Sequence, residues 1–143
     1  MTQIDFHTHV ADQIGHICRL VRKARAQAAD SRIVILTQDR RQLSALDQAL
    51  WTFSAQDFLP HAEVHEPMAA QSPVVLTDSD QNELPHHDIL INLSGAVPAH
   101  FAQFGRMIEI VSTEGGDVAT GRQRYAHYRQ RGYPLSHHDM SQP

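Results

Sequence analysis

Arg32-Ile33-Val34-Ile35-Leu36 is the run of sequence from which the architecture of this chain can be worked out. A short, unbroken apolar run of this kind is typical of a strand buried on both faces in the middle of a parallel sheet. Asp39 follows, and Gln42 three residues later completes a pattern that resembles a capping box. The predicted helix continues through leucines at helical spacing, Leu43, Leu46 and Leu50. A buried strand followed by an amphipathic helix predicts parallel strands joined by right-handed crossovers.

The same alternation extends in both directions along the chain. Residues 3–8 alternate as a strand does, and Asp12 can cap a helix that carries an apolar stripe as far as Ala28. We predict further strands over 73–76, 88–93 and 107–111, a short helix over 97–104, and a final helix from 115 to near Gly132. The predicted fold class is α/β: a single-domain three-layer Rossmann-like sandwich with a mostly parallel central sheet over residues 1–135, followed by a polar C-terminal tail over 136–143.

Length and composition exclude several classes of protein. At 143 residues the chain is one domain, too short for an eightfold barrel. Its formal net charge of −4 argues against direct nucleic-acid binding, which usually needs a basic excess. The single cysteine, Cys18, excludes an internal disulfide, and no apolar run is long enough to span a membrane. We therefore expect a cytoplasmic protein without membrane contact.

The sequence lacks the glycines that a nucleotide cofactor requires. The first predicted strand is followed by Val10-Ala11-Asp12, and neither G-x-G-x-x-G nor G-x-x-x-x-G-K-[ST] occurs. Without such glycines the backbone cannot approach a pyrophosphate closely. Cys18 lies on the apolar stripe of its helix, where a thiol is an inert core residue. We expect no cofactor.

Asp5-Phe6-His7-Thr8-His9 suggests an enzymatic alternative. Two histidines separated by one residue at the end of a strand share a face, as in metal-dependent hydrolases. That chemistry normally uses a barrel with further ligands at strand ends, and the other histidines lie mostly in predicted loops or the tail. A small metal-dependent hydrolase using His7 and His9 therefore remains the alternative hypothesis.

Two stretches carry side chains suited to binding another protein. Residues 49–61 hold the only tryptophan, Trp51, and end a predicted helix, so either the core or a partner must cover these aromatics. Residues 121–133 contain four arginines and no acid in a chain of negative net charge. Arginine beside tyrosine suits an acidic peptide with an aromatic anchor, but the tyrosines could equally pack on the sheet beneath solvated arginines. Spacing alone leaves both interpretations open.

An ordered set of motifs resembles the chi subunit family of bacterial DNA polymerase III. These are Ala49-Leu50-Trp51, Phe58-Leu59-Pro60-His61, Pro73-Val74, Asp88 to Leu93, and Arg122-Gln123-Arg124-Tyr125 through Tyr128-Arg129 to Gly132-Tyr133. The order and spacing hold from the first strand to about Leu135. The resemblance implies a Rossmann-like fold without a nucleotide site, and a non-catalytic accessory subunit of the clamp loader with no active site of its own.

The resemblance also implies partners and the residues that bind them. One is the psi subunit of the clamp loader, bound through Trp51, Phe58, Pro60 and His61. The other is the acidic C-terminal tail of single-stranded DNA-binding protein, bound through Val111, Arg122, Arg124, Tyr125, Tyr128 and Arg129. A helicase is a further candidate partner for the surface around Trp51. The chain departs from the family pattern at Gln123, where Glu is frequent, and at Ala126, where a basic residue can stand.

Overall fold

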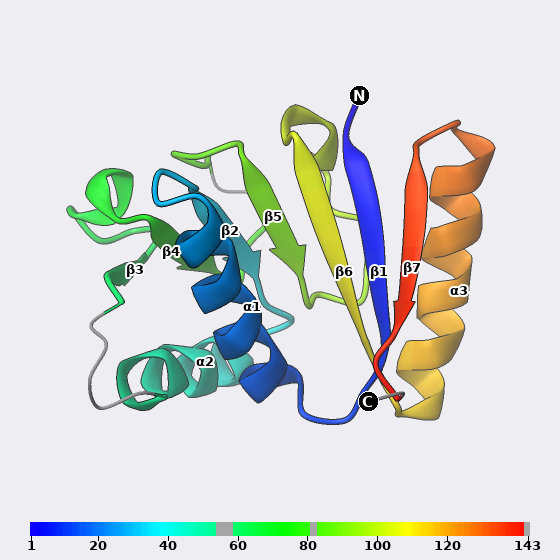
Figure 1. Cartoon of the computed structure of the whole chain (residues 1–143), viewed down its shortest axis with the longest axis horizontal. Coiled ribbons are helices and arrows are strands. Elements are labelled where there is room, and N and C mark those ends of the chain that lie inside the picture. Colours follow the sequence, from blue (N-terminus) through cyan, green and yellow to red (C-terminus); the bar gives the residue numbers. More distant parts are fainter. Residues whose placement is uncertain (54–58, 81–82, 142–143) are drawn as a thin grey trace.

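The apolar run at 33–36 lies in the middle of a parallel sheet. The computed structural model describes residues 1–53, 59–80 and 83–141. Within these ranges, seven strands follow the spatial order β3-β4-β2-β5-β6-β1-β7, and each neighbouring pair is parallel (Figure 1). The strands are β1 (Gln3–Val10), β2 (Ile33–Leu36), β3 (His61–Glu63), β4 (Val74–Thr77), β5 (Ile89–Asn92), β6 (Arg106–Ser112) and β7 (Leu135–Asp139). The predicted fold class is confirmed.

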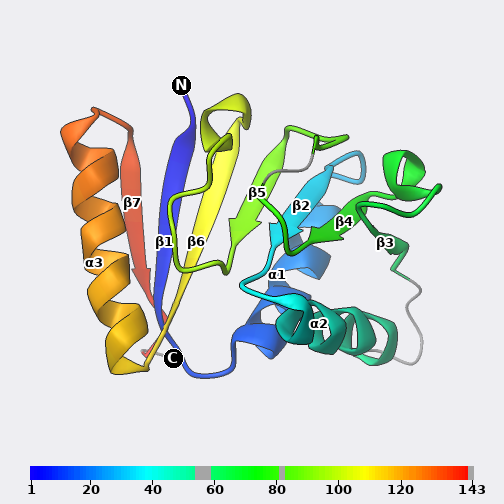
Figure 2. The same cartoon turned by 180° about the vertical axis from the view of Figure 1, so that it is seen from behind.

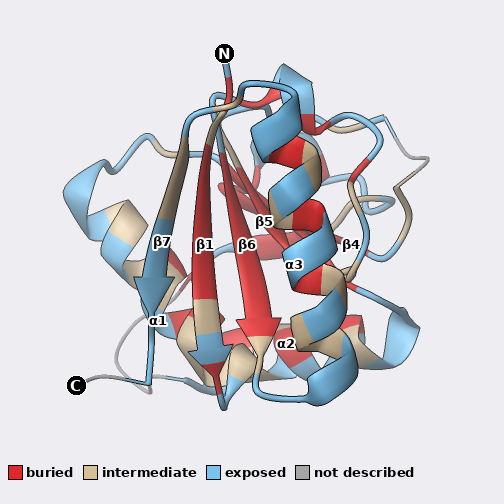
Figure 3. Ribbon diagram, turned by 90° about the vertical axis from the view of Figure 1, so that its right-hand side faces the viewer, coloured by how far each residue is buried: buried red, intermediate tan, exposed pale blue. Residues whose placement is uncertain are grey.

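Helices cover the sheet on both faces. The α-helices are α1 (Gln13–Gln27), α2 (Arg40–Thr52) and α3 (Gly115–Gln130), and the short 3-10 helices are η1 (Ala69–Gln71) and η2 (Phe101–Gln103). Helices α1 and α3 lie on opposite faces, as the view from the β7 edge shows (Figure 3). Seen from behind, α3 runs alongside β7 at one end of the sheet and α2 lies at the other (Figure 2). Among the described residues, no helix combines the length and apolarity that crossing a membrane requires.

Two apolar clusters on the two faces of the sheet explain the unbroken apolar run. Ile33 and Ile35 belong to the cluster that packs α1 and α2 against the sheet. Val34 and Leu36 belong to the other cluster, together with Tyr128 of α3. Successive side chains of a strand point to opposite faces, so a strand covered on both sides needs apolar residues at every position.

Each α-helix begins with a carboxylate cap. Asp12 accepts a hydrogen bond from Gly15 N at 3.0 Å, and Asp39 accepts one from Gln42 N at 2.8 Å. Glu114 accepts from both Gly116 N and Asp117 N, and these bonds lower the pKa of its carboxyl. The predicted caps at Asp12 and Asp39 are confirmed. These carboxylates occupy N–H donors at helix ends that would otherwise attract an anion.

The structure corrects three expectations drawn from the sequence. The helix expected over 97–104 is only the short η2, and His61–Glu63, which is not among the predicted strands, forms the edge strand β3. Residues 136–143 were expected to be a polar tail, but most of β7 lies there and pairs with β1, with Asp5 opposite Ser136. An edge strand has one unpaired side and little cover, so its sequence can be polar (Figure 3). Because most of its residues are polar, β7 could not be recognised as a strand from the sequence.

A buried ionic network fixes α3 on the sheet. Glu109 of β6 is fully buried and lies 3.2 Å from Arg124 Nε, while Tyr128 Oη donates a hydrogen bond to its carboxylate at 2.6 Å. Asn92 of β5 donates to the same carboxylate at 3.0 Å, and Arg124 also donates to Gly95 O at 2.9 Å. Burial raises the pKa of Glu109, and its partners act in the opposite direction. Burial and the neighbouring Glu109 raise the pKa of Tyr128.

Removing the cation from this network should destabilise the fold strongly. Arg124→Met leaves a buried carboxylate without its counter-charge, which costs about 3–5 kcal/mol of unfolding free energy. Chemical denaturation followed by circular dichroism measures the loss. The matched control is Arg129→Ala on the exposed face of α3, which should change stability by less than about 0.5 kcal/mol. Adding Glu109→Gln to Arg124→Met should restore part of the loss; equal stability of Arg124→Met and wild type would contradict the role of the network.

Candidate functional site beneath helix α3

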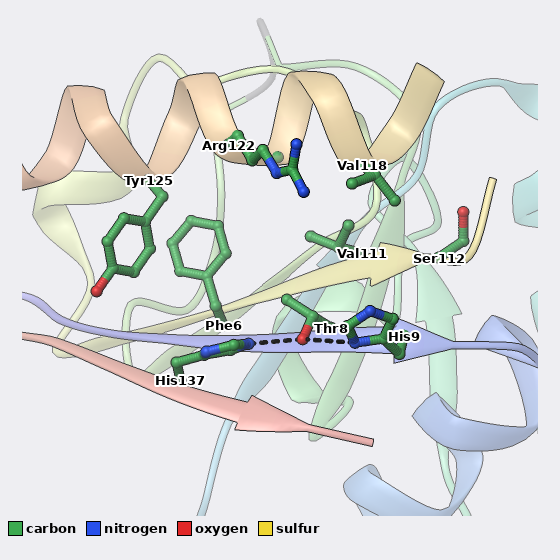
Figure 4. Close-up of a pocket in the computed structure, with 10 residues that line it drawn as sticks. Phe6, Thr8, His9, Val111, Ser112, Val118, Arg122, Tyr125 and His137 are labelled. Carbon is green, nitrogen blue, oxygen red and sulfur yellow. Dashed lines mark hydrogen bonds between the residues drawn. The ribbon is translucent and has the colours of Figure 1, made fainter. Parts of the chain in front are cut away.

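A pocket of about 290 Å³ opens between α3 and the carboxyl-terminal ends of β1 and β6 (Figure 4). Helix α3 forms one wall, and β1 and β7 form the opposite wall. The lining residues are Phe6, Thr8, His9, Val111, Ser112, Val118, Gly121, Arg122, Tyr125 and His137. Apolar side chains meet a basic residue here, an arrangement that suits a ligand carrying both an apolar group and an anionic group.

The base of the pocket is apolar and closely packed. Phe6 is 2% exposed and Val111 is 3% exposed, so only their edges reach the pocket. Tyr125 meets Phe6 edge to face with ring centroids 5.1 Å apart. Gly121 lets α3 approach β6, since a Cβ at this position would lie 3.0 Å from a methyl carbon of Val111. Arg122 is exposed above this base.

The strand wall of the pocket carries two imidazoles joined by a hydroxyl. Thr8 Oγ1 lies 2.6 Å from His137 Nε2 and 3.4 Å from His9 Nδ1 (Figure 4). His9 Nδ1 is also 3.0 Å from Asp139 Oδ1. Hydrogen bonds from the Ser141 side chain and backbone lower the pKa of Asp139, and His9 lowers it further.

The residues predicted for acidic-tail binding divide into two groups. Val111, Arg122 and Tyr125 line the pocket, and Arg129 is exposed further along α3. Arg124 is only 4% exposed and Tyr128 is fully buried, because both side chains point into the sheet and bind Glu109. In this structure both residues anchor α3 on the sheet, and their part in tail binding stays a prediction. The tail-binding residues predicted from the sequence do not include His9 and His137, although both line the pocket.

The residues predicted for psi binding lie at the opposite edge of the sheet. Trp51 is 48% exposed and its ring lies 4.3 Å from that of His61, which is buried and bonded through Nδ1 to Leu59 O at 2.8 Å. Pro60, which precedes His61 in the chain, is exposed, and the prediction for Phe58 falls outside the described residues. Phe53, which sequence reasoning did not select, is 42% exposed. We call Trp51, Phe53 and Pro60 the Trp51 surface.

The metal hypothesis fails because His7 and His9 face opposite sides of β1. His7 Nδ1 lies 2.9 Å from His16 Nε2 on α1, whereas His9 lines the pocket under α3. A bulge between His7 and Val10 and a φ of 56° at His9 break the strand alternation that would have kept them together. Among residues 1–53, 59–80 and 83–141, no group of three or more His, Cys, Asp or Glu side chains is arranged to hold a metal ion. The metal-dependent hydrolase alternative is not supported.

His7 is held neutral by its surroundings. Burial, reinforced by His16 and His138, lowers the pKa of His7 from 6.5 to about 4. Burial also lowers the pKa of His16 and raises that of the Cys18 thiol, which is fully buried as expected. This side of β1 is therefore a part of the core that resists protonation.

Protonation of His7 should make the fold sensitive to acid. A base whose pKa is depressed in the folded state contributes stability above its unfolded pKa and loses that contribution as pH falls. For His7 the contribution should be present above about pH 6.5 and should disappear towards about pH 4, with a size of roughly 3 kcal/mol. Urea denaturation at several pH values should give a flatter stability profile for His7→Gln than for wild type. The control His65→Gln changes an exposed histidine and should keep the wild-type slope; a wild-type slope in His7→Gln would refute the assignment.

Comparisons with known proteins agree with the fold and the motifs. Residues 1–136 match the family model described as the DNA polymerase III chi subunit, HolC. The DNA polymerase III subunit chi of Pseudomonas aeruginosa is 33% identical over 144 residues, which cover 98% of each chain. The subunit chi of Escherichia coli is 30% identical over 105 residues, covering 73% of this chain and 71% of the relative. That of Haemophilus influenzae is 26% identical over 105 residues, covering 73% of each. The chain belongs to the DNA polymerase III chi subunit family.

Proposed function

We propose that this chain is a non-catalytic adaptor of the clamp loader of DNA polymerase III, and that it joins the clamp loader to single-stranded DNA-binding protein. The observation that carries the proposal is the pocket beneath α3, in which Arg122 stands over an apolar base. Family membership supports a role within the polymerase holoenzyme.

The pocket suits the acidic tail of single-stranded DNA-binding protein. A tail with several carboxylates and a terminal apolar residue needs an apolar recess with cations at its rim. Phe6, Val111 and Tyr125 supply the recess, and Arg122 can hold a carboxylate in a bidentate pair. Arg129 extends the positive charge along α3, whereas the charge of Arg124 is already engaged by Glu109. Exposed pairs of this kind are screened by salt, so binding should weaken as ionic strength rises.

The Trp51 surface suits a second protein partner. Trp51 and Phe53 are large aromatics left about half exposed, and Pro60 is exposed as well; exposed aromatics of this size are typical anchors of interfaces. We assign this surface to a psi-like subunit of the clamp loader, with a helicase as a further candidate partner. Helix α2, which carries Trp51, and helix α3 lie near opposite ends of the sheet (Figure 1). A partner on the Trp51 surface therefore need not displace one in the α3 pocket.

The net charge of the chain favours contact with DNA through a protein. With a formal charge of −4, the chain lacks the basic excess that binding to phosphates requires. In the proposed role, single-stranded DNA-binding protein contacts the template and the tail alone contacts this chain.

Arg122→Ala should weaken binding of a peptide that carries the acidic C-terminus of single-stranded DNA-binding protein. Loss of a charge-assisted hydrogen bond typically costs about 1.5–3 kcal/mol, so the expected loss of affinity is roughly tenfold or more. Isothermal titration calorimetry at low and moderate salt measures it. Arg41→Ala, at an exposed arginine on α2, is the matched control and should bind as wild type does. Absence of saturable binding by the wild-type protein at low salt would refute tail binding.

Trp51→Ala should weaken binding of the psi-like subunit and leave tail binding unchanged. Truncating an aromatic anchor at the centre of an interface costs about 2 kcal/mol or more, which is roughly thirtyfold in affinity. Surface plasmon resonance with the psi-like subunit of the same organism and the tail peptide tests both sites on one sample. Met68→Ala is the control, because Met68 is 59% exposed and lies outside the Trp51 surface. Equal psi affinity in Trp51→Ala and wild type would show that the partner binds elsewhere.

A further inference from the structure

The strand wall of the α3 pocket contains titratable groups that the proposed function does not use. His9 and His137 both line the pocket and face α3 across it, with Thr8 between them (Figure 4). Helix α3 supplies Arg122 from the other wall. A ligand in the pocket would therefore lie between an arginine whose charge is permanent and two imidazoles whose charge depends on pH.

The backbone of β1 is distorted in the way that brings His9 into the pocket. Strict alternation would place His9 on the same face as His7, which contacts α1. The bulge before Val10 and the positive φ of 56° at His9 turn its side chain to the α3 face instead. A non-glycine residue with positive φ is uncommon, and such conformations cluster at functional sites.

The charges around the two imidazoles set the direction of the pH effect. Asp139 of β7 pairs with His9 and accepts hydrogen bonds from the side chain and backbone of Ser141, which lower the pKa of its carboxyl. Protonated His9 neutralises Asp139, whereas neutral His9 leaves an uncompensated carboxylate beside the pocket. That carboxylate would repel an acidic peptide.

The other charged groups near this wall are engaged elsewhere. Asp117 of α3 binds Ser112 N at 2.7 Å, and Asp12 caps α1. Asp5 of β1 pairs with Arg106 Nε at 2.6 Å, and His138 packs on His7 on the opposite face. Arg122 is the arginine among the residues that line the pocket. The histidines of the strand wall can supply further positive charge on the opposite side.

We propose that His9 and His137 are recognition residues for the carboxylates of the acidic tail, and that they make tail binding tighten as pH falls from about 8 to about 5.5. This inference rests on the proposed function, because it concerns the same pocket. Histidine is the side chain whose charge ordinarily changes between about pH 5 and about pH 8, whereas carboxylates stay ionised over this interval. Protonation of either imidazole would add positive charge to the pocket without any change in the ligand. Exposed charge pairs of this kind lead us to expect affinity roughly threefold to tenfold higher at the lower pH.

The test is a calorimetric titration of the full chain with the acidic-tail peptide at about pH 5.5 and about pH 8, at constant low salt. The decisive variant is His9→Asn combined with His137→Gln, since asparagine tolerates positive φ. The ratio of its affinities at about pH 5.5 and about pH 8 should be close to one, whereas wild type should show the increase of roughly threefold to tenfold. His65→Gln, at an exposed histidine outside the pocket, should keep the wild-type pH dependence. Asp139→Asn should bind more tightly than wild type at pH 8, an outcome that damage to the fold would not produce.

The outcomes separate this inference from the proposed function. Binding that tightens at low pH in wild type but not in the double variant supports it. Wild-type binding that is equal at both pH values overturns the inference and leaves tail binding intact, and so does unchanged pH dependence in the double variant. Absence of binding at both pH values overturns the inference and the proposed function together.

Discussion

The buried carboxylate of Glu109 is the constraint on which the pocket depends. An ionised group in a core without water must be matched by a counter-charge and hydrogen bonds, and α3 supplies Arg124 and Tyr128 for that purpose. These two residues are one helical turn apart, so their engagement fixes the rotation of α3 about its axis. That rotation in turn places Arg122 and Tyr125 over the pocket. The network therefore orients the candidate site, although Glu109, Arg124 and Tyr128 are not among the residues that line the pocket.

The candidate site lies beside the carboxyl-terminal ends of β1 and β6 but on the α3 face of the sheet, and not in the crevice that doubly wound folds usually use. Ligands in such folds usually bind in the crevice at the carboxyl ends of the strands, with phosphates at helix N-termini. Here a hollow of about 550 Å³ at that edge is lined in part by Glu114 and Asp117 of α3. The carboxylate of Glu114 already accepts hydrogen bonds from the first turn of α3, and Asp12 and Asp39 do the same for α1 and α2. An anion would meet carboxylates there, whereas the pocket on the side of α3 offers Arg122.

How far the sequence could predict this structure depended on whether a feature was local. The unbroken apolar run at 33–36, the helical leucines and the aspartate caps are local signals, and each identified its element. The strand β7 was missed because an edge strand does not need alternating apolar residues, and Ser136 and His137 are both polar. The roles of Arg124 and Tyr128 depended on Glu109, a charged residue on a strand otherwise apolar from 107 to 111. Helical spacing could show that Tyr125 and Tyr128 share a face, but it could not show which of them meets a buried carboxylate.

The position of His9 could not be predicted from the sequence either, because it depends on a bulge in β1. That position also bears on the proposed adaptor role. A pattern of alternating residues assumes a regular strand, so it placed His7 and His9 together and suggested a metal site; the bulge separates them. The separation gives each face of β1 a different role: His7 is buried and contacts His16 of α1, whereas His9 lines the α3 pocket. In the proposed adaptor, the Trp51 surface lies near β3 and the pocket near β7, with the parallel sheet between them as a rigid spacer. Two sites at opposite edges with no shared residue should bind their partners independently. A change in pH would then alter the affinity for the acidic tail and leave the affinity for the clamp loader unchanged.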